Sequence, residues 1–160
     1  MQLDDTDRTI LAVLQANART SNADIARQVG MAPSAILDRI RKLEAKGIIL
    51  GYEARLDARA LGCGLLAFVF VKTDEKVGSV STGEHLAEIP EVLEVHDVAG
   101  EDCYLVKLRV ESTEALGRLL RDRFGSIGAV RNTRTTIVLN TVKDVARLPL
   151  EPQDTAVQHD

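Results

Sequence analysis

A short stretch in the second half of the chain, AGEDCYLVKL (residues 99–108), gathers side chains that can do chemistry. It places a glycine, two carboxylates and a thiol at Gly100, Glu101, Asp102 and Cys103, between two expected strands. Glycine tolerates positive φ and lets the backbone approach a ligand. Successive loop amides can hold a carboxylate, and either acidic side chain can meet an ammonium group. An amino acid carries both groups, so we predict an amino-acid site here, with a plain turn as the alternative.

Two hydroxyl residues are candidates to complete this site. Thr133 and Thr135 alternate along a later expected strand, although ordinary strand packing accounts for them nearly as well. The Cys103 thiol reads as a small pocket or sheet residue rather than a redox switch, because no cationic neighbour in sequence lowers its pKa.

Catalysis and metal binding find little support in the sequence. The three histidines, His85, His96 and His159, lie far apart and match no metal-binding spacing. Cys103 and His96 would lie on different strands without a third orienting group. The chain also lacks a glycine-rich phosphate loop. We therefore predict a protein that is not an enzyme and that uses no metal or cofactor.

A second set of residues lies on one side of a helix expected to begin at Pro33. Ile36, Ile40 and Leu43 form its apolar stripe at helical spacing. The side chains away from this stripe form a surface that can meet phosphates and base edges of double-stranded DNA. The candidate DNA-binding residues are Ser34, Ala35, Asp38, Arg39, Arg41 and Lys42.

Three short helices position that surface. Asp4 can cap the first helix, Ser21 with Asp24 forms a capping box for the second, and Gly30 and Gly47 end the second and third. Two short helices around the tight GMAP connection predict a helix-turn-helix. The alternative is a small helical bundle with a solvated basic face.

Strands and helices alternate from residue 65 onward. LLAFVFVKT, EVLEVHDVA, DCYLVKLRV and the strand ending in TTIVL surround two helix-length stretches. Residues 89–92 and 127–130 each connect a helix to a strand, so the two halves resemble each other. This order predicts a ferredoxin-like βαββαβ domain, whose uncovered sheet face commonly pairs with a second copy. The predicted fold is α+β, with a helix-turn-helix domain (1–50), a hinge strand and linker (51–64), a ferredoxin-like domain (65–148) and a polar tail (149–160).

Composition agrees with an ordinary globular protein of 160 residues, with 45% hydrophobic and 28% charged residues. Residues 1–60 hold nine Lys and Arg against eight Asp and Glu, a balance of +1. Residues 61–160 hold eleven against sixteen, a balance of −5, so the acidity belongs to the second part. The longest apolar run, residues 61–71, is far short of the roughly 20 residues of a membrane span. The N-terminus carries no signal pattern, so we expect no membrane association, a cytoplasmic location and reduced cysteines.

Four stretches in order resemble the Lrp/AsnC (feast/famine) transcriptional regulators from about residue 3 to 148. They are LDDTDRTILAVLQANART, ADIARQVGMAPSAILDRIRKLEAKGIILGYEARLD, PEVLEVHDVAGEDCYLVKLRV and VRNTRTTIVLNTVK. The resemblance implies a DNA-binding domain, a hinge strand, and a ferredoxin-like domain that dimerises and binds amino acids. It also implies dimers that assemble further, often into octamers, with the effector between dimers.

The chain departs from the family pattern at three positions. Ala32 stands where a serine N-cap is usual, at a cost of about 1 kcal/mol, and Asp38 stands where a basic residue is usual. Cys103 replaces an aspartate before the aromatic residue, so neither operator sequence nor effector transfers from relatives.

The predicted function is a sequence-specific transcriptional regulator whose DNA binding or assembly responds to an amino acid or a related small metabolite. The main alternative is an architectural DNA-binding protein without an effector. A third possibility is an amino-acid-sensing module that acts on a protein partner.

Overall fold

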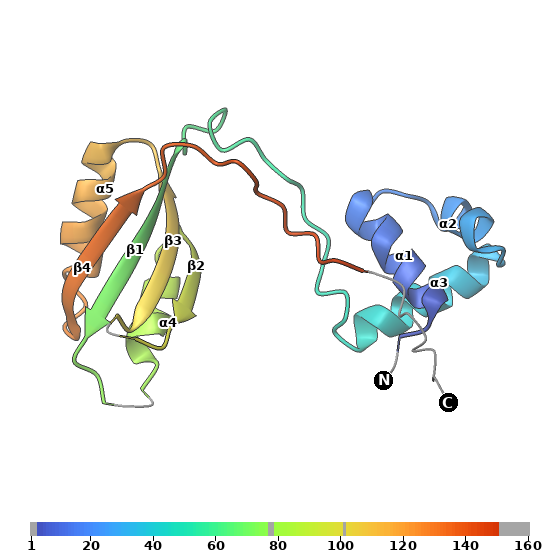
Figure 1. The fold of residues 1–160 in the computed structure, drawn as a ribbon, viewed down its shortest axis with the longest axis horizontal. Coiled ribbons are helices and arrows are strands. Elements are labelled where there is room, and N and C mark those ends of the chain that lie inside the picture. Colours follow the sequence, from blue (N-terminus) through green and yellow to red (C-terminus); the bar gives the residue numbers. More distant parts are fainter. Residues whose placement is uncertain (1–2, 77–78, 101, 151–160) are drawn as a thin grey trace, which may run out of the picture. The chain divides into compact units, whose positions relative to one another are not determined.

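The computed structural model describes residues 3–76, 79–100 and 102–150. Among these residues the chain forms two compact units, one made of residues 3–54 and 144–150 and the other of residues 55–143. Figure 1 shows the helical unit and the sheet-containing unit.

Local side-chain caps define the helices of the first unit, α1 (Asp5–Ala16), α2 (Asn22–Val29) and α3 (Pro33–Ala45). The Asp4 carboxylate accepts a hydrogen bond from the backbone N–H of Asp7 in the first turn of α1, at 2.7 Å. The Ser21 hydroxyl accepts a hydrogen bond from the backbone N–H of Asp24 in the first turn of α2, at 3.1 Å. Each cap satisfies a backbone donor that has no partner within its helix. The helix bounds themselves confirm the three predicted helices.

A glycine turn connects α2 to α3. Gly30 adopts a φ of 69°, and the following N–H, of Met31, donates to the Ala26 carbonyl at 3.0 Å. This left-handed conformation suits glycine because it has no Cβ. Ala32 begins α3 without a side-chain cap, and Pro33 occupies the first turn. The connection is therefore the predicted helix-turn-helix.

One apolar stripe from each helix forms the core of this unit. Ile10, Ile25, Ile36 and Leu43 are fully or almost fully buried there. Burial of these side chains stabilises the unit because apolar surface is removed from water.

The second unit alternates strands and helices in chain order. Its elements are β1 (Leu65–Thr73), α4 (Ser81–Ala87), β2 (Val92–Asp97), β3 (Tyr104–Val110), α5 (Thr113–Leu119), the π-helical turn η1 (Leu120–Phe124) and β4 (Val130–Ile137). The strands lie in the order β2-β3-β1-β4, and every neighbouring pair is antiparallel. This arrangement confirms the predicted ferredoxin-like βαββαβ fold.

The two faces of the sheet differ in burial. Val69 and Val71 of β1 are fully buried in a core that also contains Leu86 of α4 and Phe124 of η1. Figure 1 shows α4 and α5 on this side of the sheet. Phe68 and Phe70 of β1 point to the opposite face and are only half-buried. We call that second surface the open face; among the described residues of this unit it carries no helix.

The expected hinge strand does not form in residues 51–64 of this chain, so that prediction was wrong for the single chain. Residues 57–63 instead form turns, in which the Leu61 N–H donates to Asp57 and the Cys63 N–H donates to Ala58. A strand requires a neighbouring backbone to accept and donate its hydrogen bonds, and no segment of the described chain pairs with these residues.

The C-terminal boundary also differs from the expectation. Residues 144–150 belong to the helical unit, although residues up to 148 were expected in the ferredoxin-like domain. Arg147 and Leu148 of this segment form hydrogen bonds with α1, which is distant in sequence. None of the described helices is long and apolar enough to cross a lipid bilayer.

Candidate functional site

The predicted DNA-binding residues lie on the outward side of α3. Ser34, Asp38, Arg41 and Lys42 are exposed, and Ala35 is half-buried. The opposite side of α3 is buried in the core of the helical unit. Helical periodicity therefore separates a packed side from a side that is open to a partner.

Arg39 differs from the other candidates because it is held by two carboxylates. Its guanidinium lies 2.7 Å from an oxygen of Asp4 and 2.7 Å from an oxygen of Asp7. The hydrogen bonds that Arg39 donates, first to Asp4 and then to Asp7, raise the pKa of Arg39. The pKa of Asp4 is lowered, first by the Asp7 backbone N–H and then by Arg39. In this arrangement Arg39 links α3 to the start of α1 through two ion pairs within the chain.

The remaining surface of α3 combines opposite charges. Arg41 and Lys42 supply cations that suit phosphate oxygens and the acceptors of guanine. Asp38 repels phosphate but can accept a hydrogen bond from the amino group of cytosine. This surface can therefore discriminate between base pairs as well as attract the DNA backbone.

The loop between β2 and β3 contains the other predicted site. Gly100 has a φ of 149°, in the region that favours glycine, whereas Glu101 lies outside the described residues. Backbone hydrogen bonds fix the end of the loop, because the Cys103 N–H donates to Val71 O at 2.9 Å and the Val98 N–H donates to Cys103 O at 3.0 Å.

Cys103 packs into the end of the sheet. The residue is half-buried against the core, and its Sγ accepts from the Thr73 N–H at 3.5 Å. Cys103 thus lies directly before β3 and contacts the end of β1.

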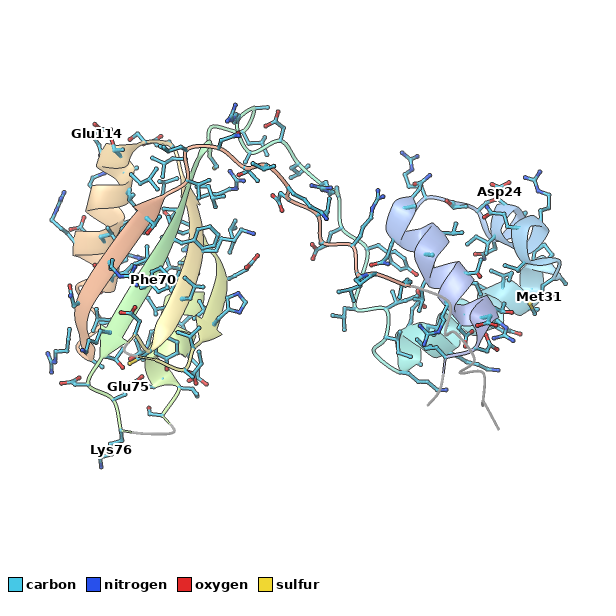
Figure 2. All side chains as sticks on the ribbon, in the orientation of Figure 1. Asp24, Met31, Phe70, Glu75, Lys76 and Glu114 are labelled. Carbon is cyan, nitrogen blue, oxygen red and sulfur yellow. The ribbon has the colours of Figure 1, made fainter. Side chains whose placement is uncertain are left out.

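Asp102 pairs with a residue that the sequence analysis did not select. Its carboxylate accepts a hydrogen bond from Arg134 at 2.9 Å. The same guanidinium lies over the ring of Phe70, 4.0 Å from the ring centroid. Figure 2 labels Phe70 on the sheet. A carboxylate, a guanidinium and an aromatic ring thus meet at the edge of the open face.

The structure does not bring Thr133 and Thr135 together with this group. Their register partners on β1 are Val71 and Val69, whose side chains are buried on the helix-covered face. Directly paired residues of antiparallel strands share a face, so the two threonines point away from Arg134. The sequence showed that they alternate with Arg134, but not which of the two sets faces the helices.

The described residues contain no group of three or more His, Cys, Asp or Glu side chains arranged to hold a metal ion. The helical unit presents the exposed charged side of α3, and the sheet-containing unit carries the polar loop between β2 and β3.

Comparison with known proteins gives both units a family. Residues 3–49 match a winged helix-turn-helix DNA-binding model, and residues 66–148 match the Lrp/AsnC ligand binding domain. The HTH-type transcriptional regulator FL11 of Pyrococcus horikoshii is 39% identical over 150 residues, which cover 93% of this chain and 97% of that protein. The leucine-responsive regulatory protein of Escherichia coli (strain K12) is 36% identical over 151 residues, covering 93% and 92%.

A solved structure extends the similarity to the fold. The complex of a Neisseria meningitidis transcriptional regulator with L-methionine superposes with a TM-score of 0.87 at 32% identity, covering 93% of this chain and 97% of that one. Fold, α3 surface and comparisons together define a transcriptional regulator with a DNA-binding unit and a ligand-binding unit. Its relatives are regulators, a class of proteins that are not enzymes. The chain belongs to the Lrp/AsnC family.

Proposed function

We propose that this regulator binds operator DNA through α3 and that an amino acid, held by the loop after β2, changes its DNA binding or its assembly. The DNA part of this proposal rests on the exposed side chains along one side of α3. The Gly30 turn before α3 sets where this helix begins relative to α2. We assign base and phosphate contacts to Ser34, Ala35, Asp38, Arg41 and Lys42. Arg39 is left out because both of its carboxylate partners lie within this chain.

The amino-acid part rests on the charges around the loop. Asp102 offers a carboxylate for an ammonium group, and the position where Gly100 would carry a side chain is open space. Arg134 adds a cation for a carboxylate, which the predicted site lacked. A solved relative contains L-methionine, so methionine and leucine are the first ligands to test.

A homodimer is the proposed assembly, because the open face carries half-buried apolar side chains such as Phe68, Phe70 and Leu105. Pairing two open faces would remove these side chains from water. Further assembly to an octamer follows the family pattern. As a regulator of transcription, the protein would act on chromosomal DNA in the cytoplasm.

The DNA part is tested by selecting duplexes from a random pool with the full-length protein. The selected duplex should be bound more tightly than random DNA at fixed salt, because base contacts add to the phosphate contacts. Equal binding of selected and random duplexes would contradict sequence-specific recognition.

The amino-acid part is tested by thermal shift with the twenty amino acids. A ligand that binds only the folded state raises its melting temperature. Asp102→Ala should abolish the shift, whereas Asp122→Ala, an exposed aspartate of η1, should keep it. Arg134→Ala should weaken amino-acid binding. Its control is Arg131→Ala, a substitution on the same strand, β4, that removes a different ion pair, the one with Asp74.

One observation favours a second function, an architectural DNA-binding protein without an effector. The Asp102 carboxylate already has a partner in Arg134, so this charge is paired without a ligand. Selective DNA binding together with no thermal shift from any amino acid would support this second function.

A further inference from the structure

The C-terminal segment of the described chain is bound to α1 of the DNA-binding unit. The Leu148 N–H donates to the side-chain oxygen of Gln15 at 2.8 Å, and the Gln15 amide donates back to the Leu148 carbonyl at 3.1 Å. A side-chain amide thus pairs with both backbone groups of one residue, as a neighbouring strand would. Leu150 then packs against the apolar core of the helical unit.

A cation completes the contact at the end of α1. Arg147 donates a hydrogen bond to the Ala16 carbonyl at 3.3 Å. The last carbonyls of a helix lack partners within the helix and carry a partial negative charge. The last turn of α1 contains no basic residue of its own, so Arg147 supplies the missing cation from the other end of the chain. Pro149 favours an extended backbone at Leu148, which suits this pairing.

Chain connectivity gives this contact a mechanical consequence. The chain leaves the helical unit after residue 54, forms the sheet-containing unit, and rejoins the helical unit at residue 144. Two chain connections therefore join the DNA-binding unit to the other unit, one before residue 55 and one after residue 143. A connection that ends in a docked segment restricts motion more than a free tail would.

We infer that residues 147–150 form a C-terminal clasp on α1 that positions the DNA-binding unit for paired recognition. The inference rests on the proposed dimer, since two DNA-binding units must meet two half-sites at a fixed spacing. Each unit loses orientational freedom when both half-sites are bound, and the clasp removes part of that freedom beforehand. The clasp residues lie outside α3 and are not assigned to any DNA contact.

A matched pair of substitutions at one position tests the clasp. Leu148→Pro removes the N–H that donates to Gln15 and keeps the backbone extended. Leu148→Ala keeps that N–H and removes only a side chain that is 70% exposed. Gln15→Ala removes both hydrogen bonds by changing α1 instead of the C-terminal segment. It introduces no proline, so an effect shared with Leu148→Pro does not come from a folding defect caused by proline. A chain that ends at Leu150 keeps the whole clasp and is the control for the residues beyond it.

The first measurement is DNA binding by full-length protein at fixed salt, using selected duplexes with two half-sites or one. Leu148→Pro and Gln15→Ala should weaken binding to the two-half-site duplex by about ten-fold and leave the one-half-site duplex unchanged. Leu148→Ala and the chain ending at Leu150 should match the wild type on both duplexes. Equal losses on both duplexes would overturn the positioning role, because they would mean that the clasp only keeps the helical unit folded. Wild-type affinity of Leu148→Pro and Gln15→Ala on both duplexes would also overturn the role.

The second measurement is amide hydrogen exchange of the C-terminal half of α1 in the absence of DNA. Exchange should be faster in Leu148→Pro and Gln15→Ala than in Leu148→Ala. Unchanged exchange in the first two variants would overturn the clasp itself. If the wild type binds both duplexes equally, the proposed paired recognition fails and the positioning role fails with it, while this measurement still decides whether the clasp forms.

Discussion

Replacing Arg39 should destabilise the protein, whereas replacing Arg41 should weaken its DNA binding. The two arginines lie on the same helix, two positions apart, but in different environments. Arg39 pairs with Asp4 and Asp7, and Arg41 is exposed. The pair of variants therefore separates a structural arginine from a recognition arginine.

The size of the Arg39→Ala effect follows from the exposure of its partners. The Asp7 side chain is only 12% exposed, and leaving such a carboxylate without its partner costs about 1–3 kcal/mol. The Asp4 side chain is 54% exposed, and its pair adds about 0–1 kcal/mol because water screens it. We expect the free energy of unfolding of the helical unit to fall by about 2 kcal/mol. For a unit of this size that corresponds to roughly 10 °C in melting temperature.

Calorimetry and amide hydrogen exchange of α1 measure the stability of the helical unit. Titration with the selected duplex, at a temperature well below the melting temperature, measures DNA affinity. Arg39→Ala should keep DNA affinity within about three-fold once the folded fraction is taken into account. Arg41→Ala should change stability by less than about 0.5 kcal/mol. Its DNA affinity should fall by about 1–3 kcal/mol, with a salt slope reduced by about 1. An Arg39→Ala protein of unchanged stability and strongly reduced DNA affinity would refute the assignment.

Three further predictions concern single residues. Ala32→Ser should raise stability by about 1 kcal/mol, because it supplies the missing N-cap of α3; denaturant titration would contradict this with an unchanged or lower midpoint. Hydrogen bonds, first from the Ser81 hydroxyl, lower the pKa of Glu75 from 4.5 to about 2, so its stabilising effect is complete above pH 4.5 and is lost as the pH falls toward 2. Acid unfolding of Glu75→Gln should therefore depend less steeply on pH in that window, and a slope equal to wild type would rule out this role. Phe124→Ala should cost about 3–5 kcal/mol, because the ring is fully buried, and a loss below about 1 kcal/mol in denaturant titration would contradict the packing.

Local sequence patterns were enough to predict the helices of the DNA-binding unit and the order of strands and helices after it. Asp4, Ser21 and Gly30 act within three or four residues of their own positions, so their capping roles can be read from local spacing. The alternation of apolar residues in β1 likewise showed which side chains share a face. It could not show which face the helices cover. For that reason Thr133 and Thr135 were predicted to lie with Asp102, although Asp102 pairs with Arg134 and the two threonines lie on the other face of the sheet.

The pairing of charges and amides depends on how distant parts of the chain fold together. Arg39 and Asp4 are separated by 35 positions, Arg134 and Asp102 by 32, and Gln15 and Leu148 by 133. No local periodicity encodes such pairs, because any exposed arginine on α3 has the same sequence signature whether it meets a carboxylate or solvent. The hinge strand failed for a related reason, since a strand forms only when another backbone lies beside it, and a single sequence does not state which backbone that will be.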